Sequence, residues 1–147
     1  MINFFFETDF ELNHPDFTRI WIGKCIENEQ SNLGEVNVIF CDDNYLLEIN
    51  KKHLDHDYFT DIISFDYSDE NQISGDIFIS IDRVLDNANT YEIAFEEELH
   101  RVIIHGFLHY LGYSDHTEEE QLIMRQKEDE YLKLRQKLAI ELPNRLS

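Results

Sequence analysis

The residues most able to do chemistry lie in segment 105–116, which reads His-Gly-Phe-Leu-His-Tyr-Leu-Gly-Tyr-Ser-Asp-His. His105 and His109 are four residues apart in a region whose apolar side chains recur with helical spacing. Both imidazoles are therefore expected to project from one face of a helix. Gly112 predicts the end of that helix, because glycine readily adopts the left-handed conformation found just past a last turn.

This spacing indicates a metal site. Imidazole nitrogens bind zinc at about 2.0–2.1 Å, and two histidines four apart on a helix can both reach one ion. Beyond the glycine, Asp115 or His116 can turn back to supply a third ligand. Three protein ligands and an open fourth position are typical of a catalytic zinc site. Two hydrated histidines on a partly exposed helix are the simpler alternative, but the glycine and the Asp-His pair favour the metal site.

The same residues exclude one class of zinc enzyme. Zinc peptidases with the His-Glu-x-x-His motif have a glutamate directly after the first histidine, where it acts as the general base. Gly106 occupies that position and has no basic side chain. A peptidase function is therefore disfavoured.

Segment 105–113 and the Asp-His pair that follows it resemble the signature of the YbeY family, the metal-dependent endoribonucleases of ribosomal RNA maturation. The family pattern is His-Gly-x-Leu-His-x-x-Gly-Tyr-Asp-His. Two upstream stretches are also similar: 60–65, which reads Thr-Asp-Ile-Ile-Ser-Phe, and 75–80, which reads Gly-Asp-Ile-Phe-Ile-Ser. The resemblance extends from about Val36 to the acidic helix after the last histidine of the motif.

The resemblance implies one zinc ion, or another divalent metal, at a site in which His105, His109 and Asp115 are catalytic. Ser114 is an additional residue, so six residues separate His109 from His116 where the family has five, and the five-residue spacing falls on Asp115. We expect His116 to be the third ligand, because the Asp-His order is kept, with Asp115 as the alternative. If Asp115 is not a ligand, it is the nearest candidate for a general base.

The chain also departs from the family at an arginine that is implicated in activity. Leu54 occupies the matching position. Basic residues nearby could replace the lost phosphate contact, but a lysine is a point charge without the guanidinium fork. The candidates are Lys51, Lys52, His53 and His56.

The overall charge argues against strong, unaided binding of RNA. The chain has 147 residues and a formal net charge of −19, whereas nucleic-acid binders normally carry a basic patch. Half of its 12 basic residues lie in the last helix and tail: Arg125, Lys127, Lys133, Arg135, Lys137 and Arg145. They either form such a patch or pair with glutamates along a solvated helix. Weak intrinsic affinity, with a partner delivering the substrate, fits this composition.

The apolar pattern predicts one α+β domain over residues 1–147 with a small mixed sheet, and the resemblance implies four strands with the metal cleft at one side. The predicted strands are 1–7, 35–41, 61–67 and 73–80, the last two forming a hairpin. The predicted helices are 13–26, 42–53, 80–89, 93–111 and 117–140. The packing face expected for the last helix is Leu122, Ile123, Tyr131, Leu134 and Leu138.

Two further expectations concern single residues. Arg101 lies four residues before His105 and can face the cleft, but a salt bridge to Glu97 or Glu98 is the favoured interpretation. The two cysteines have no metal-type spacing and are expected to be buried or idle thiols in a reducing compartment. With no leader or membrane span in the sequence, the cytoplasm is the expected location.

These observations lead to one main functional hypothesis. The resemblance implies that the chain is a metal-dependent, single-strand-specific endoribonuclease of ribosomal RNA processing, maturation and quality control. Its expected partners are single-stranded RNA, ribosomal RNA above all, and the ribosome or its associated proteins, with no membrane or DNA. The alternatives are a non-catalytic, metal-stabilised factor associated with the ribosome, and a metal-dependent hydrolase of another substrate.

Overall fold

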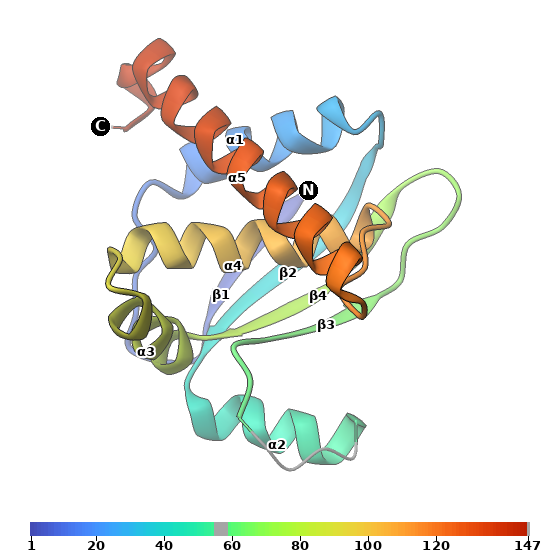
Figure 1. Cartoon of the computed structure of the whole chain (residues 1–147), viewed down its shortest axis with the longest axis vertical. Coiled ribbons are helices and arrows are strands. Elements are labelled where there is room, and N and C mark those ends of the chain that lie inside the picture. The colour runs from blue at the N-terminus through green and yellow to red at the C-terminus, as the bar shows by residue number, and fades with distance from the viewer. Residues whose placement is uncertain (55–58, 147) are drawn as a thin grey trace.

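The computed structural model describes residues 1–54 and 59–146, which form a four-stranded sheet with helices around it (Figure 1). The strands are β1 (Ile2–Phe6), β2 (Leu33–Cys41), β3 (Ile62–Asp66) and β4 (Ile73–Ser80). The helices are α1 (Pro15–Asn28), α2 (Asp43–Leu54), α3 (Ile81–Tyr91), α4 (Phe95–Tyr110), α5 (Glu118–Glu141) and the 3-10 helix η1 (Pro143–Leu146).

The sheet is mixed, as predicted. Its strand order is β1-β2-β4-β3, with β1, β2 and β4 parallel and β3 antiparallel to β4. The predicted hairpin of the last two strands is therefore confirmed, and so is the α+β fold class. The parallel pairs need crossover connections, and helices α1 and α2 supply them.

The two faces of the sheet are covered by different helices, with α4 on one face and α2 on the other (Figure 1). Side chains alternate along β4 accordingly. Ile77 and Ile79 are buried in the main core with α4, whereas Phe78 packs into a smaller cluster with Leu46 of α2. None of the described helices is long and apolar enough to cross a membrane. Both cysteines are buried free thiols, as expected.

Helix α4 lies close to the sheet where the two histidines project. A Cβ atom added at Gly106 would lie 2.9 Å from Ile62 Cδ1 of β3 and 3.1 Å from Ile77 Cδ1 of β4. The glycine after the first histidine thus has a packing role. It leaves room for the Ile62 and Ile77 side chains between the helix and the sheet.

The packing of the first strand and the last helix differs from the prediction. Strand β1 was expected to be covered, but it is an edge strand, and Phe5 and Phe6 remain 47% and 44% exposed. Leu122 and Ile123 are 59% and 42% exposed, so their assignment to the packing face of α5 was wrong. The buried residues of this helix are Met124, Glu128, Tyr131 and Leu138.

Gly75 offers a test of the packing between the sheet and α4. A Cβ at this position would lie 2.2 Å from the Phe65 carbonyl oxygen and 2.4 Å from the Tyr110 hydroxyl, so the hairpin and α4 would have to shift. We expect Gly75→Ala to lower the free energy of unfolding by about 1–3 kcal/mol, the usual cost of overpacking. Urea denaturation measures this change.

Gly23→Ala is the matched control. Nothing lies within 4 Å of a Cβ at Gly23, which is inside α1. Alanine there should leave the free energy of unfolding unchanged or raise it by up to about 1 kcal/mol. Equal effects of the two substitutions would contradict the close packing at Gly75.

Candidate metal centre

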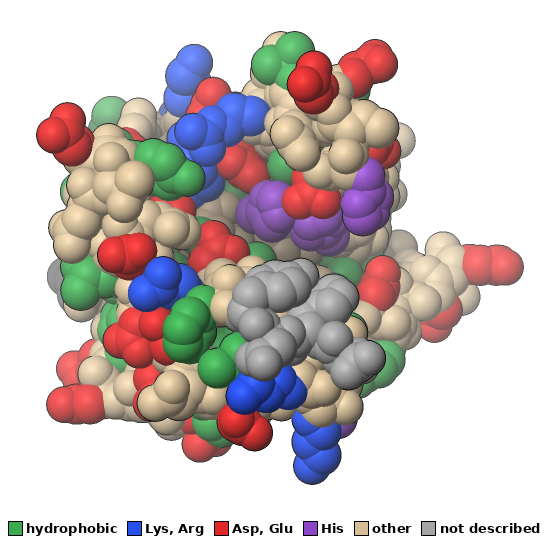
Figure 2. Space-filling model, turned by 60° about the horizontal axis from the view of Figure 1, so that its bottom comes forward, with side chains coloured by type: hydrophobic (Ala, Val, Ile, Leu, Met, Phe, Trp, Pro, Cys, Tyr) green, Lys and Arg blue, Asp and Glu red, His purple; other side chains and the backbone are tan. Residues whose placement is uncertain are grey.

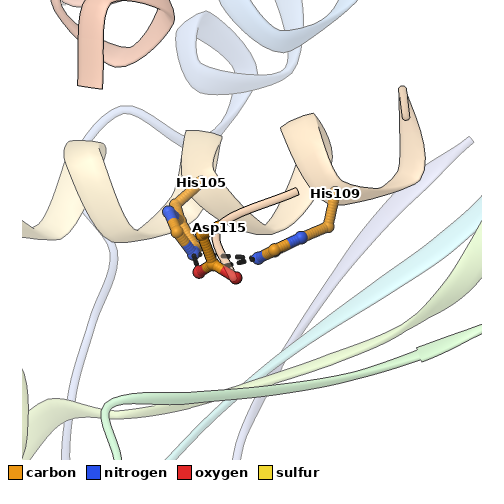
Figure 3. Close-up of side chains that lie close together, drawn as sticks. All are labelled: His105, His109 and Asp115. Atoms are coloured by element: carbon orange, nitrogen blue, oxygen red, sulfur yellow. Dashed lines mark hydrogen bonds and ion pairs between the residues drawn. The ribbon is translucent and has the colours of Figure 1, made fainter. Parts of the chain in front are cut away.

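Three side chains from two segments meet at one point. His105 and His109 lie on one side of α4, and Asp115 reaches them from the turn between α4 and α5 (Figure 3). The Nε2 atoms of the two histidines are 3.0 Å apart. Asp115 Oδ2 lies 3.3 Å from Nε2 of His105 and 3.4 Å from Nε2 of His109. Within the described part of the chain, this is the group of three such side chains that could hold a metal ion.

Hydrogen bonds at the outer nitrogen of each histidine ring determine the tautomer, and so whether the inner nitrogen offers a lone pair to the centre of this group. His105 Nδ1 lies 2.7 Å from Glu128 Oε2, and His109 Nδ1 lies 3.1 Å from the Tyr113 carbonyl oxygen. Both partners are acceptors, so in the neutral rings each Nδ1 carries the proton and donates it. Each Nε2 is then left with a free lone pair directed at the other.

This arrangement fits a divalent cation. Ligand atoms about 2.0–2.1 Å from a tetrahedrally coordinated ion lie about 3.3 Å from one another, and the three separations here are 3.0, 3.3 and 3.4 Å. Two imidazole lone pairs at such a distance repel each other unless a cation or a shared proton lies between them. Imidazole nitrogen with carboxylate oxygen is a common donor set for zinc.

The turn that carries Asp115 is held at both of its ends. Gly112 has a φ of 99°, in the left-handed region, and ends α4 as predicted. The next side chain, Tyr113, donates its hydroxyl to Glu29, the residue just after α1, at 2.7 Å. At the other end, a capping box at Thr117 starts α5. The backbone of the turn therefore has little freedom, and Asp115 is held facing the histidines.

His116 does not join this group. Its side chain is exposed, whereas Asp115 occupies the third position. The structure therefore places Asp115, the alternative third ligand, beside the two histidines, and not His116, which was preferred. Ser114 lengthens the turn by one residue, which moves residue 116 past the point where the turn faces the helix. The number of residues after His109, rather than the Asp-His order, thus determines which side chain lies beside the two histidines.

Glu128 of α5 is part of the site and was missed by the sequence analysis. Its side chain is 6% exposed, and both of its oxygens are in use. Oε2 accepts from Nδ1 of His105, and Oε1 accepts from Arg101 at 3.0 Å. A carboxylate behind a metal-ligating histidine fixes the orientation of the ring and raises its basicity as a ligand.

Arg101 is placed differently from the prediction. Its guanidinium donates to Glu128 and, at 2.8 Å, to Asp129, both on α5. The expected pairing with Glu97 or Glu98 was therefore wrong, because α5 packs over the side of α4 that carries the histidines. Arg101 thus holds Glu128 in place behind the metal-facing ring.

The two histidines have opposite pKa shifts. Burial by itself disfavours the charged form of His105, but the Glu128 carboxylate outweighs this, and the net pKa of His105 is raised. Burial and the neighbouring charge of His105 lower the pKa of His109. The pair therefore loses its protons in two steps, and His109 is neutral before His105 as the pH rises.

One side of the group remains accessible. The side chains of His105, His109 and Asp115 are 22%, 30% and 35% exposed. Two cavities of about 320 and 520 Å³ both border on His105 and Asp115. Figure 2 shows the histidines reaching the surface around an acidic group, with basic side chains beside them. A reactant can therefore approach the three ligand atoms from outside.

The candidates proposed to replace the family's arginine lie elsewhere. Leu54 ends α2 and is 41% exposed, and Lys51, Lys52 and His53 belong to the same helix, on the opposite face of the sheet from α4 (Figure 1). Among the described residues, they do not line either cavity beside the histidines. His56 lies outside the described residues.

Within the described residues, the fold and the site define a protein in which two histidines of a helix and an aspartate of the following turn form a group that could hold a metal ion and is open to a reactant. The family model "Endoribonuclease YbeY" matches residues 8–136. The chain belongs to this family. Membership confirms the prediction of an endoribonuclease, a hydrolase that acts on RNA.

Several relatives and one solved structure support this assignment. Proteins named endoribonuclease YbeY from Flavobacterium psychrophilum and Flavobacterium johnsoniae are 54% and 53% identical to this chain. The matches cover 91% and 88% of this chain and 96% and 94% of the relatives. The solution structure of TM1509 from Thermotoga maritima superposes with a TM-score of 0.69 at 25% identity, covering 90% of this chain and 87% of TM1509.

The role of Glu128 can be tested by its effect on metal affinity. Replacing an outer-shell partner of a metal ligand typically costs about 10–100-fold in affinity. We expect Glu128→Gln to weaken zinc binding within this range above neutral pH, because the neutral amide makes His105 a poorer donor. Competition with a chromogenic chelator measures the change. Glu119→Gln, at an exposed position of the same helix, is the control, and an equal loss in both variants would contradict the role of Glu128.

The raised pKa of His105 predicts the pH dependence of metal binding. Ligation requires a neutral imidazole, so a proton on His105 competes with the cation. Because the pKa of His105 lies above its ordinary value of 6.5, zinc affinity should begin to fall above that pH and continue to fall on acidification. In Glu128→Gln the fall should start at lower pH. A zinc affinity that stays constant to about pH 5 in the wild type would contradict this assignment.

Proposed function

We propose that this chain is a metal-dependent, single-strand-specific endoribonuclease acting in ribosomal RNA processing and maturation and in ribosome quality control, with zinc as its cofactor. One observation carries the proposal: three ligand atoms 3.0–3.4 Å apart, open on one side, in a chain of the YbeY family. We assign the whole activity to one domain over residues 1–147, located in the cytoplasm.

His105, His109 and Asp115 would hold the ion. When bound there, a divalent cation would polarise a phosphodiester oxygen and lower the pKa of a water molecule. The protein's own contribution is to keep both Nε2 atoms unprotonated and directed inward, through Glu128 and the Tyr113 carbonyl. Since the Asp115 carboxylate lies against both histidines, we assign it as a ligand rather than a general base.

A cation bound by the histidines and Asp115 would also reduce the repulsion between RNA and a chain whose formal net charge is −19. A bound cation makes the cleft locally positive, but RNA would still be repelled at long range. The basic residues near the end of the chain offer little help, because many are engaged. Lys127 pairs with Glu29 and Glu130, and Lys137 pairs with Glu141. Delivery of the RNA by the ribosome or an associated protein is consistent with this surface.

A non-catalytic, metal-stabilised factor on the ribosome is the second candidate, and the acidic surface favours it. The open side of the metal group favours the enzyme, because structural zinc sites are normally closed by a fourth protein ligand. The two candidates differ in a simple property: the enzyme cleaves RNA, and the factor binds its partner without cleavage.

Cleavage of a labelled, unstructured RNA by the zinc-loaded protein tests the proposal. We expect chelation to abolish cleavage. His109→Ala and Asp115→Asn should reduce it by more than about 100-fold, the upper end of the effect of an outer-shell partner. His116→Ala should retain activity, because His116 is exposed and outside the group.

Stoichiometric zinc without cleavage would support the non-catalytic factor instead. Loss of cleavage in His116→Ala, with Asp115→Asn active, would overturn the ligand assignment. A duplex RNA of the same sequence is the substrate control, and efficient cleavage of it would contradict specificity for single strands.

A further inference from the structure

The cavity of about 320 Å³ beside the metal group lies between α3, α4, α5 and the start of β3. Its volume is within the range of pockets that hold small organic ligands, about 300–1,000 Å³. His105 and Asp115 line one end of it, so a group that fills it adjoins the ligand atoms. If the chain cleaves RNA as proposed above, a nucleotide next to the cleaved bond has to occupy this space or pass over it.

Arg125 is a cationic side chain at this cavity that is available to a ligand. It lines this cavity and the neighbouring one of about 520 Å³, and its side chain is 59% exposed. It forms an ion pair with Glu128 Oε1 on its own helix at 3.8 Å, a distance too long for a hydrogen bond. By contrast, Arg101 lines the same cavity but is 15% exposed and bound to two carboxylates. Figure 2 shows basic side chains beside the histidines on this face.

Tyr91 provides an aromatic ring at the same cavity. It is the last residue of α3, lines the cavity and is 58% exposed. An exposed ring beside a cation is the combination that single-strand binders use, because bases stack on the ring while the cation contacts the backbone. An arginine also presents paired donors that match the geometry of a phosphate.

The remaining wall of the cavity is polar and suits a base edge. Asn87 donates to Asp61 at 3.1 Å and to Glu98 at 3.3 Å. Carboxylate oxygens accept hydrogen bonds from the amino groups of bases. Burial raises the pKa of both Asp61 and Glu98.

We propose that this cavity is the subsite for a nucleotide flanking the cleaved phosphodiester, with Arg125 binding its phosphate and Tyr91 stacking on its base. This subsite rests on the proposed endoribonuclease function. It supplies the phosphate contact that the sequence lacks at Leu54, and it does so from α5 instead of α2. A single basic contact at the metal group also suits a strongly acidic protein whose substrate is delivered to it.

Binding of a fluorescein-labelled single-stranded 2′-O-methyl RNA to the zinc-loaded full chain tests the subsite. Arg125→Gln should raise Kd about 10-fold and reduce the slope of log K against log salt by about 0.7, the contribution of one phosphate contact to a single strand. Tyr91→Leu should raise Kd by about 5-fold or more without changing that slope, whereas Tyr91→Phe should bind like the wild type. In cleavage assays, Arg125→Gln and Tyr91→Leu should raise KM more than they lower kcat.

Lys133→Gln, which removes the same charge from an exposed position of α5, and Tyr67→Leu, which removes a 64% exposed ring beyond β3, are the controls. Losses in these controls equal to those of Arg125→Gln and Tyr91→Leu would overturn the subsite. So would a loss of zinc affinity in Arg125→Gln, which would assign Arg125 to holding Glu128. Cleavage and binding unchanged in both test variants would overturn the subsite alone. A wild type that neither binds nor cleaves single-stranded RNA would overturn the proposed function as well.

Discussion

The lone pairs of two imidazole nitrogens face each other across 3.0 Å, and the rest of the structure is arranged to keep them there. Each outer nitrogen donates to an acceptor, a carboxylate behind His105 and a backbone carbonyl behind His109, so neither inner nitrogen holds a proton in the neutral pair. Such an arrangement is unfavourable in isolation. It becomes favourable when a cation, together with the carboxylate of Asp115, occupies the space between the rings.

Each supporting element acts on this pair. The absence of a side chain at Gly106 lets α4 lie close to β3 and β4, and the left-handed Gly112 turns the chain back so that Asp115 can reach the rings. Helix α5 adds Glu128, which accepts from His105 and from Arg101 of α4. The energetic consequence is that metal binding and the packing of α5 on α4 are coupled, because the same carboxylate serves both.

Most of the fold could be predicted from the sequence, because the strands and helices have clear apolar periodicity and the hairpin strands are close in sequence. Within the site, His105, His109 and Gly112 were predictable from local spacing. Asp115 was not the preferred third ligand, because the Asp-His order of the family pattern was given more weight than the number of residues between His109 and the third ligand. Glu128 was missed because a charged residue in a helix is normally expected to face solvent, whereas Glu128 lies on the buried side of α5. For the same reason the apolar residues Leu122 and Ile123 were wrongly assigned to the buried side. Only the tertiary contact with His105 reveals its role.

A crystal structure of the protein with zinc, with the ion located by anomalous scattering, would show whether His105, His109 and Asp115 bind the metal. We expect one ion about 2.0–2.2 Å from Nε2 of His105, Nε2 of His109 and a carboxylate oxygen of Asp115, with solvent at the fourth position and Glu128 still bound to His105. An ion held by His116 in place of Asp115, a fourth protein ligand, or no ion between the two histidines would contradict it.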